Sequence, residues 1–312
     1  MSTKSSISKL KYSENNLTWV SIKDADEKAI EYLSKNYKFH PLDLEDCLSE
    51  VQRPKIDDYE NYLFIVLHVP VRTSRKKNIH MAEINIFIGQ NFVITLHDNH
   101  HVLNSIFDEC KKNKKTRAEY LDKGSGYFLY MIIDDLFESG MPLVDSLAKQ
   151  TNELEVDVFE SDDYSRDRLK DILLLKKDII NFRRIIMPQR AIIAQLEHKN
   201  KKFLPDNLDV YFDDIVDKIE RIWNGLENLQ ELVSSIQETN ESIISHNTNN
   251  VIKILTIFSV TMLPLTFFTG FYGMNVIGLP FAEHRLSVLI ITGFLVLIVV
   301  SMISYFRYKK WL

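Results

Sequence analysis

The chain has 312 residues, of which 45% are hydrophobic, and its formal net charge is −5. This length suits one large domain or two of ordinary size, and the apolar share is normal for a protein with a core. The acidic balance argues against a nucleic-acid binder, which usually presents a basic face.

The N-terminal residues and the cysteines indicate an intracellular soluble part. Residues 1–16 are polar and show no signal peptide. Cys47 and Cys110 lie far apart and lack the spacing of metal ligands, so we expect free buried thiols in a reducing compartment. The soluble part is therefore expected in the cytoplasm.

Residues 1–125 predict a cytosolic α+β domain with a small sheet. Asp24 is a candidate cap for a helix whose inner face carries Ile30 and Leu33. Pro54 favours a turn over residues 52–57. The other expected elements are helices at residues 40–48 and 102–112, strands at residues 17–22, 62–69, 82–88 and 91–96, and a hairpin turn at Gly89-Gln90.

Residues 126–204 predict antiparallel helices of the cytosolic domain. One helix is expected over residues 126–160, and a second over residues 165–187, ending at Pro188. An acidic tip between them suits a solvated helix end, and the alternative is a surface that concentrates divalent cations. The tip comprises Glu153, Glu155, Asp157, Glu160, Asp162 and Asp163.

A stalk helix is predicted over residues 205–250. Pro205 is a good helix-starting residue, and neither Pro nor Gly occurs between Gly225 and Pro264. We therefore expect one helix over residues 206–271, about 100 Å long at 1.5 Å per residue. Apolar residues recur along it at alternating spacings of four and three, which is a heptad seam. The seam residues are Leu208, Phe212, Ile215, Ile219, Ile222, Leu226, Leu229, Val233 and Ile236.

Two uncharged runs near the C-terminus predict membrane spans, because a bilayer core needs roughly 20 apolar residues. The predicted order is a first span at residues 251–271, an external loop at residues 272–285, a second span at residues 286–306 and a basic tail at residues 307–312. By the positive-inside rule, the tail and the N-terminal domain lie in the cytoplasm.

The first span carries hydroxyl groups, whereas the second is almost entirely Leu, Ile and Val. Two helices cannot enclose an aqueous path, so several copies are expected to assemble around one axis. Mg²⁺ usually keeps its waters, and hydroxyl, carboxamide and carbonyl groups can bind those waters. One helical track along the first span passes Asn249, Ile252, Leu255 or Thr256, Ser259, Leu263, Thr266 and Gly270.

These residues resemble the CorA-type magnesium transport proteins. The resemblance rests on Gly273-Met274-Asn275 after Tyr272 at the outer end of the first span, on Pro264-Leu265-Thr266-Phe267 and on the closing Lys309-Lys310-Trp311-Leu312. A cytosolic block matches too: His40-Pro41-Leu42, Leu44-Glu45-Asp46, Gln52-Arg53-Pro54-Lys55 and Tyr59-Glu60-Asn61-Tyr62. The resemblance covers nearly the whole chain, and its motifs are jointly specific.

The resemblance implies a funnel-shaped homopentamer in the inner (plasma) membrane that conducts hydrated Mg²⁺ and is not an enzyme. Asn275 would form the selectivity filter, shaped by Gly273 and Met274, and Ile252 and Leu255 would form a hydrophobic constriction. The implied pore-lining residues are Asn249, Ile252, Leu255, Ser259, Leu263 and Thr266. Regulatory Mg²⁺ would bind between cytosolic domains on Asp46 and Asp214, with Glu45 assisting. Co²⁺ and Ni²⁺ stay open as transported ions.

Two other functions are considered. The first is zinc transport, as in the related two-span branch. The second is a membrane-anchored enzyme or metal sensor, supported by His97-Asp98-Asn99-His100-His101 after a strand. For that segment a strand-end loop with exposed histidines is favoured over a metal site.

Overall fold

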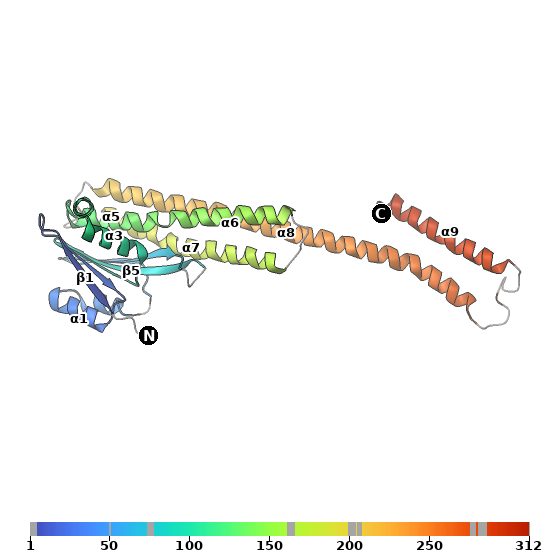
Figure 1. The fold of residues 1–312 in the computed structure, drawn as a ribbon, viewed down its shortest axis with the longest axis horizontal. Helices are drawn as coiled ribbons and strands as arrows, with labels where there is room; N and C mark the ends of the chain where they lie inside the picture. Colours follow the sequence, from blue (N-terminus) through green and yellow to red (C-terminus); the bar gives the residue numbers. More distant parts are fainter. Residues whose placement is uncertain are drawn as a thin grey trace. The chain divides into compact units, whose positions relative to one another are not determined.

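The structure is a computed structural model that describes residues 5–49, 51–73, 78–160, 166–198, 204, 208–274, 279 and 286–311. The chain forms two compact units, Met1–Gln237 and Glu238–Leu312. Figure 1 shows the elements in chain order.

Among the described residues, the first unit is built on a six-stranded sheet with the order β1-β2-β6-β5-β4-β3. Strands β2 and β6 are parallel, and the other neighbours are antiparallel. Gly89 pairs with Phe92 across the turn that joins β5 to β6. The α+β prediction and its four strands are confirmed. The strands are β1 (Ser6–Lys11), β2 (Thr18–Lys23), β3 (Lys55–Asp58), β4 (Leu63–Val71), β5 (His80–Gly89) and β6 (Phe92–His97).

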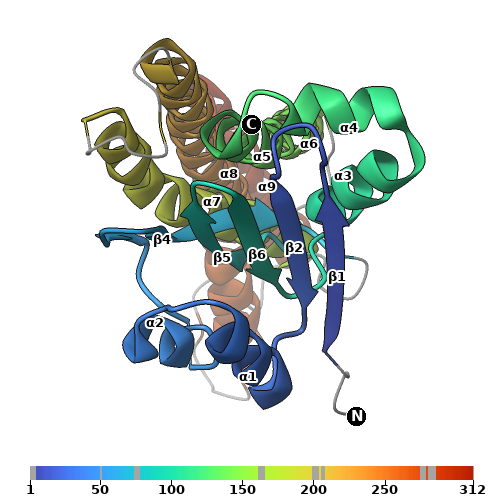
Figure 2. The same cartoon turned by 90° about the vertical axis from the view of Figure 1, so that its left-hand side faces the viewer.

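Helices cover both faces of the sheet (Figure 2). Helices α1 (Glu27–Asn36) and α2 (Pro41–Asp46) lie on one face, where the core includes Phe64, Val66 and Phe87. Every residue of β4 is buried, as expected for a strand covered on both sides. The helices on the other face are α3 (His101–Lys112), α4 (Lys114–Leu121), α5 (Ser125–Glu138) and α7 (Arg166–His198).

Several short elements differ from the prediction. Strand β1 was not predicted. Only Leu10 of this strand is buried, so the strand carries little of the apolar alternation by which strands are predicted. Strand β3 occupies part of the predicted turn at residues 52–57 and pairs with the edge of β4. Helix α4 is additional to the predicted elements. The predicted cap Asp24 is wrong, since the carboxylate of Asp26 accepts the N–H of Ala29 at 3.0 Å.

The single helix predicted over residues 126–160 is wrong. The chain forms α5 and then α6 (Met141–Glu160), with a turn at Ser139 and Gly140. Pro142 lacks a backbone N–H and so favours a new helix start. A Cβ added at Gly140 would lie 3.6 Å from both Ile222 Cδ1 and Phe182 Cζ. The turn therefore lies within contact distance of both Phe182 and Ile222.

The predicted helix end at Pro188 is also wrong, because α7 continues to His198 with Pro188 inside it. Gln189, the next residue, is completely buried. Its Oε1 accepts the N–H of His68 on β4 at 3.2 Å, and its Nε2 donates to the carbonyl of Ile185 at 3.1 Å. Contacts with the sheet thus hold the helix together beyond a proline that disfavours it locally.

The predicted stalk helix is confirmed as α8 (Asp209–Tyr272), which continues into the first apolar run. Every residue of the predicted heptad seam, from Leu208 to Ile236, is buried. Lys218 on the same helix lies 2.5 Å from Asp134 and 2.8 Å from Glu138 of α5. An apolar seam and flanking ion pairs therefore fix the first part of α8 against the other helices.

The end of β6 and the segment after it bury two histidines, so the prediction of exposed histidines is wrong for His97 and His100. His97 Nδ1 accepts the N–H of His100 at 2.9 Å, and His97 Nε2 lies 3.2 Å from Ser21 Oγ. Within the described ranges, both ring nitrogens of His100 lack a hydrogen-bond partner. No group of three or more His, Cys, Asp or Glu side chains in the described part of the chain could hold a metal ion.

Acid is expected to unfold the first unit through these histidines. Burial lowers the pKa of His97 to about 4 and that of His100 to about 3, both below the unfolded value near 6.5. The stability that depends on the neutral rings is full above about pH 6.5 and is lost as the pH falls toward 4, by about 3 kcal/mol for each ring. Denaturant unfolding followed by circular dichroism from pH 7.5 to 4.5 measures this loss. A His97→Gln/His100→Gln variant should show a flatter profile, and equal slopes would contradict the assignment.

Candidate ion pathway and metal sites

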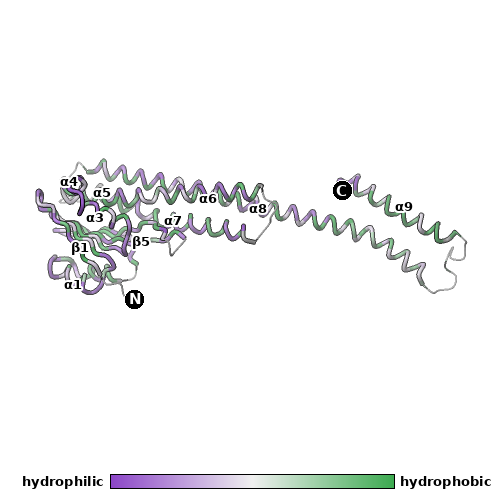
Figure 3. The backbone as a smooth tube through the Cα atoms, viewed as in Figure 1, coloured by the Kyte–Doolittle hydropathy of each residue, from purple (hydrophilic) through white to green (hydrophobic). Residues whose placement is uncertain are grey.

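Within the part of the chain that the structure describes, two helices are long and apolar enough to cross a membrane by length and composition. They are α8 and α9 (Ser287–Tyr308). Figure 3 shows the hydrophobic residues along the C-terminal part of α8 and along α9. The predicted first span at residues 251–271 falls within α8, and the predicted second span at residues 286–306 begins one residue before α9.

In the second unit, one face of α8 packs toward α9. The rings of Phe268 and Phe294 meet edge to face, with centroids 5.2 Å apart. Successive residues of an α-helix are about 100° apart around its axis. The α8 residues that share the α9-facing side on this basis are half-buried. They are Lys253, Ile257, Thr261, Pro264 and Phe268.

Five of the six residues predicted to line a pore lie on the opposite side of α8, whereas Asn249 lies about a quarter turn from the face that meets α9. All six are exposed within the single chain. Leu255 is 63% exposed and Leu263 is 71% exposed, which is costly for large apolar side chains in contact with water. At 100° per residue, the positions of the five are centred roughly half a turn from the face that meets α9. This face is therefore free to contact lipid or other copies of the chain.

The threonines in the first apolar run of α8 already use their hydroxyl protons. Thr266 Oγ1 donates to the carbonyl of Met262 at 2.9 Å, and Thr256 Oγ1 donates to the carbonyl of Ile252 at 2.7 Å. The oxygen lone pairs of a hydroxyl whose proton is engaged can still accept hydrogen bonds. Thr266 can therefore accept hydrogen bonds from water on the face of α8 that carries Leu263.

The end of α8 is set by a close approach of the main chain at Gly273. The N–H of Gly273 donates to the carbonyl of Thr269 at 2.9 Å, and that of Met274 donates to the carbonyl of Phe271 at 3.4 Å. A Cβ on Gly273 would lie only 2.9 Å from the Thr269 oxygen. The site thus requires glycine. Asn275, the third residue of the motif, lies outside the described residues.

The three acidic residues predicted to bind regulatory Mg²⁺ have different surroundings. Glu45 and Asp214 are exposed. Asp46, at the end of α2, is already paired, because its Oδ2 lies 2.8 Å from Lys55 Nζ on β3. Lys55 Nζ also lies 2.6 Å from Asp57 Oδ2. The predicted ligand Asp46 therefore has an internal counterion that the sequence analysis did not identify.

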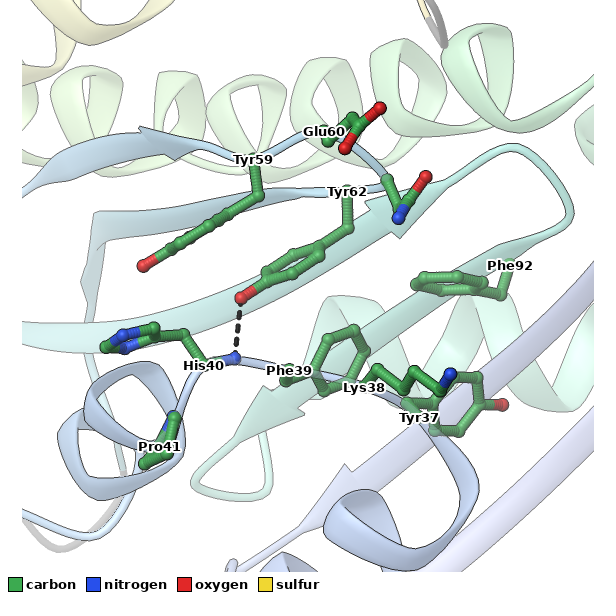
Figure 4. Close-up of a pocket in the computed structure, with 10 residues that line it drawn as sticks. Tyr37, Lys38, Phe39, His40, Pro41, Tyr59, Glu60, Tyr62 and Phe92 are labelled. Carbon is green, nitrogen blue, oxygen red and sulfur yellow. Dashed lines mark hydrogen bonds between the residues drawn. The ribbon is translucent and has the colours of Figure 1, made fainter.

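Asp43, which is absent from the predicted site residues, holds α2 in place. Asp43 is buried, and its carboxylate accepts hydrogen bonds from Tyr62 at 2.7 Å and Tyr59 at 3.0 Å. The hydroxyl of Tyr62 in turn accepts the N–H of His40 at 2.8 Å (Figure 4). Burial raises the pKa of Asp43, while the two tyrosine hydrogen bonds oppose that shift. Asp43 and Asp46 are three residues apart on a short helix, which places them on the same face. This spacing was the signal that the sequence offered.

An open pocket of about 510 Å³ lies beside this cluster (Figure 4). It is lined by the faces of Tyr37, Phe39, Tyr59, Tyr62 and Phe92. Rings on its walls stack on one another, with Tyr59 and Tyr62 centroids 4.5 Å apart. This packing braces the segment that leads from α1 into α2.

The predicted acidic tip is described only in part, since residues 162 and 163 lie outside the described ranges. Glu153 lies 3.8 Å from Lys149, one helical turn earlier on α6. That pair is exposed and contributes little to stability.

Comparison with known proteins agrees with this architecture. The family described as CorA-like Mg²⁺ transporter protein matches residues 14–310. YfjQ of Bacillus subtilis is 29% identical over 94% of this chain and 89% of its own length. The cobalt/magnesium transport protein CorA of Thermotoga maritima is 27% identical over 95% of this chain and 83% of its own length.

A solved structure shares the whole fold. The complete structure of the CorA magnesium transporter from Methanocaldococcus jannaschii aligns with a TM-score of 0.85 at 21% identity, covering 100% of both chains. The long α8 that carries the first apolar run, the second apolar helix and the sheet-based unit therefore form a known arrangement. With a family match that spans nearly its entire length, this chain belongs to the CorA family of divalent cation transporters, which are ion transporters of membranes and not enzymes.

Proposed function

We propose that several copies of this chain, five by the resemblance, form a channel-like transporter for passive influx of hydrated Mg²⁺. The observation that carries this proposal is the exposed side of α8, opposite its contact with α9. In a ring of copies, α8 would face the axis and α9 the lipid. The side chains of Asn249, Ser259 and Thr266 would then meet water at the axis.

The chemistry of this side suits an ion that keeps its hydration shell. Mg²⁺ dehydrates reluctantly, and the waters around it donate hydrogen bonds outward. The hydroxyl of Thr266 supports this role, because its proton is donated to the carbonyl of Met262 and its oxygen can still accept hydrogen bonds. Asn275 would supply the carboxamide oxygen of the filter, with Gly273 and Met274 shaping the turn before it.

Ile252 and Leu255 are proposed as the hydrophobic constriction. Both are large, apolar and more than half exposed in the single chain. A narrow ring of such side chains excludes water and closes a pore by dewetting. When the ring is wide enough to stay wet, the membrane potential drives influx, contributing about 4.6 kcal/mol per 100 mV for a divalent ion, from ~2.3 per charge.

We further propose that intracellular Mg²⁺ closes the channel by bridging neighbouring copies. Asp46 and Glu45 of one copy would face Asp214 of the next, and a cation between them would turn repulsion into attraction. The exposure of Glu45 and Asp214 supports this arrangement. It also requires both chain ends in the cytoplasm, as the basic tail after α9 favours.

Growth rescue of a bacterial strain that lacks magnesium uptake tests the transport proposal. The chain should restore growth at low Mg²⁺, and Asn275→Ala should not. Asn36→Ala, which alters an exposed carboxamide on α1, is the matched control and should rescue fully. Equal rescue by Asn275→Ala would overturn the filter assignment.

Uptake into proteoliposomes separates the magnesium proposal from zinc transport. With a membrane potential and no proton gradient, Mg²⁺ uptake is expected. Uptake of Zn²⁺ that needs a proton gradient, without Mg²⁺ uptake, would favour the zinc alternative.

A further inference from the structure

Lys55 joins two carboxylates that belong to different elements of the first unit. Its Nζ lies 2.8 Å from Oδ2 of Asp46 at the end of α2 and 2.6 Å from Oδ2 of Asp57 on β3. Residues 55 and 57 are two apart on a strand, so their side chains stand on the same face. The ammonium is thus shared between a neighbour on its own strand and Asp46 on another element.

The position of Lys55 is well defined. Its ammonium lies 5.3 Å from the ring centroid of Phe64 on the adjacent strand. Partial burial lowers the pKa of Lys55, but hydrogen bonds to Asp46 and Asp57 outweigh it and raise the pKa above its ordinary value. Lys55 is therefore a permanent cation at physiological pH.

The same Asp46 oxygen cannot serve Lys55 and a metal ion at once. Mg²⁺ on Oδ2 would take the atom that Lys55 uses, and Mg²⁺ on the other oxygen would be repelled by the nearby ammonium, so Lys55 opposes metal binding to Asp46 in either mode. The ammonium keeps its ion pair with Asp57 when Mg²⁺ occupies Asp46. The side chains of Asp46 and Lys55 are 23% and 34% exposed, so this exchange takes place where hydrated ions can reach.

We propose that Lys55 is an internal competitor for Mg²⁺ at Asp46, and that Asp57 holds its ammonium when Mg²⁺ is bound. The strength of the Lys55–Asp46 pair then sets the Mg²⁺ concentration at which the regulatory site fills. This inference rests on the regulatory role proposed above for Asp46. It assigns functions to Lys55 and Asp57 that follow from the distances around one ammonium group.

The proposal predicts opposite effects for two substitutions. Lys55→Met keeps the aliphatic stem beside Phe64 and removes the competing charge, so the half-saturating Mg²⁺ concentration should fall. Asp57→Asn removes the alternative partner and ties Lys55 to Asp46, so that concentration should rise. Each shift is expected to be about threefold to fivefold, the change that one partly exposed ion pair can produce.

Limited proteolysis of the purified full-length protein across a Mg²⁺ titration measures the half-protective concentration without measuring transport. Lys35→Met is the matched control, because Lys35 pairs with Glu31 on α1 and its loss changes the net charge equally. Lys35→Met should leave the midpoint unchanged. If Lys55→Met is poorly folded by circular dichroism, Lys55→Gln and Asp57→Asn give the same comparison.

Asp46→Asn distinguishes the competitor role of Lys55 from the regulatory role of Asp46. If Asp46→Asn weakens protection but Lys55→Met and Asp57→Asn leave the midpoint in place, the competitor role is overturned and the regulatory site stands. If Asp46→Asn leaves protection unchanged, the regulatory role of Asp46 is overturned, and the competitor role with it.

Discussion

Gly273→Ala is expected to lower Mg²⁺ uptake at least tenfold while the first unit keeps its fold. The new Cβ would lie 2.9 Å from the carbonyl oxygen of Thr269, which also accepts the N–H of Gly273. That oxygen belongs to the main chain of a helix, so the clash is relieved only by moving the helix end. Met274 and Asn275 follow directly and must move with it.

The size of the effect follows from the proposed filter, to which each copy would contribute the carboxamide of Asn275. A displaced carboxamide in each copy would lose a hydrogen bond to the hydrated ion, worth about 1 kcal/mol. Two such losses exceed the about 1.4 kcal/mol that corresponds to a factor of ten. Uptake into proteoliposomes, followed with a Mg²⁺-sensitive dye, measures the loss.

Gly293→Ala is the matched control for this prediction. Gly293 lies within α9, and a Cβ there would meet no described atom within 4 Å. Its uptake should equal that of the unmodified chain. Normal uptake by Gly273→Ala would show that the close approach to Thr269 does not position the filter.

The helices that could be predicted from sequence are those whose pattern is repeated many times. The seam of α8 repeats from Leu208 to Ile236, and each position proves to be buried. Pro188 misled the prediction because a single residue gives only a local preference. Gln189 bonds to the sheet residue His68, 121 positions away, and this contact outweighs the local cost.

In the candidate site, too, repeated patterns could be predicted and contacts between elements could not. The exposed side of α8 could be read from helical periodicity, because all six residues lie on one continuous helix. The surroundings of Asp46 could not be predicted from periodicity. Lys55 was visible in the motif only as a neighbour of Pro54, and its contact with Asp46 depends on how β3 packs beside α2. Pairing between elements is not encoded by spacing within either one.

Asp43 is expected to contribute strongly to the stability of the first unit. Asp43→Ala should lower the free energy of unfolding by about 3 kcal/mol, because it leaves the buried hydroxyl of Tyr62 without its acceptor and opens a cavity. For a unit of this size the midpoint of thermal unfolding should fall by about 10 °C. Differential scanning calorimetry of the purified protein measures the shift.

Asp43→Asn keeps the shape of the side chain and one acceptor oxygen, so it should cost no more than about 1 kcal/mol. Both variants remove the charge of Asp43. The difference between their free energies of unfolding therefore reports the hydrogen bonds and the side-chain shape that Asn keeps and Ala loses. Because Asp43 anchors the helix that carries Asp46, Asp43→Ala should also raise the Mg²⁺ concentration needed for protection from proteolysis, whereas Asp43→Asn should not. If both variants were equally stable, the tyrosine hydrogen bonds could not be what holds α2, and the position of Asp46 would have to depend on its ion pair with Lys55.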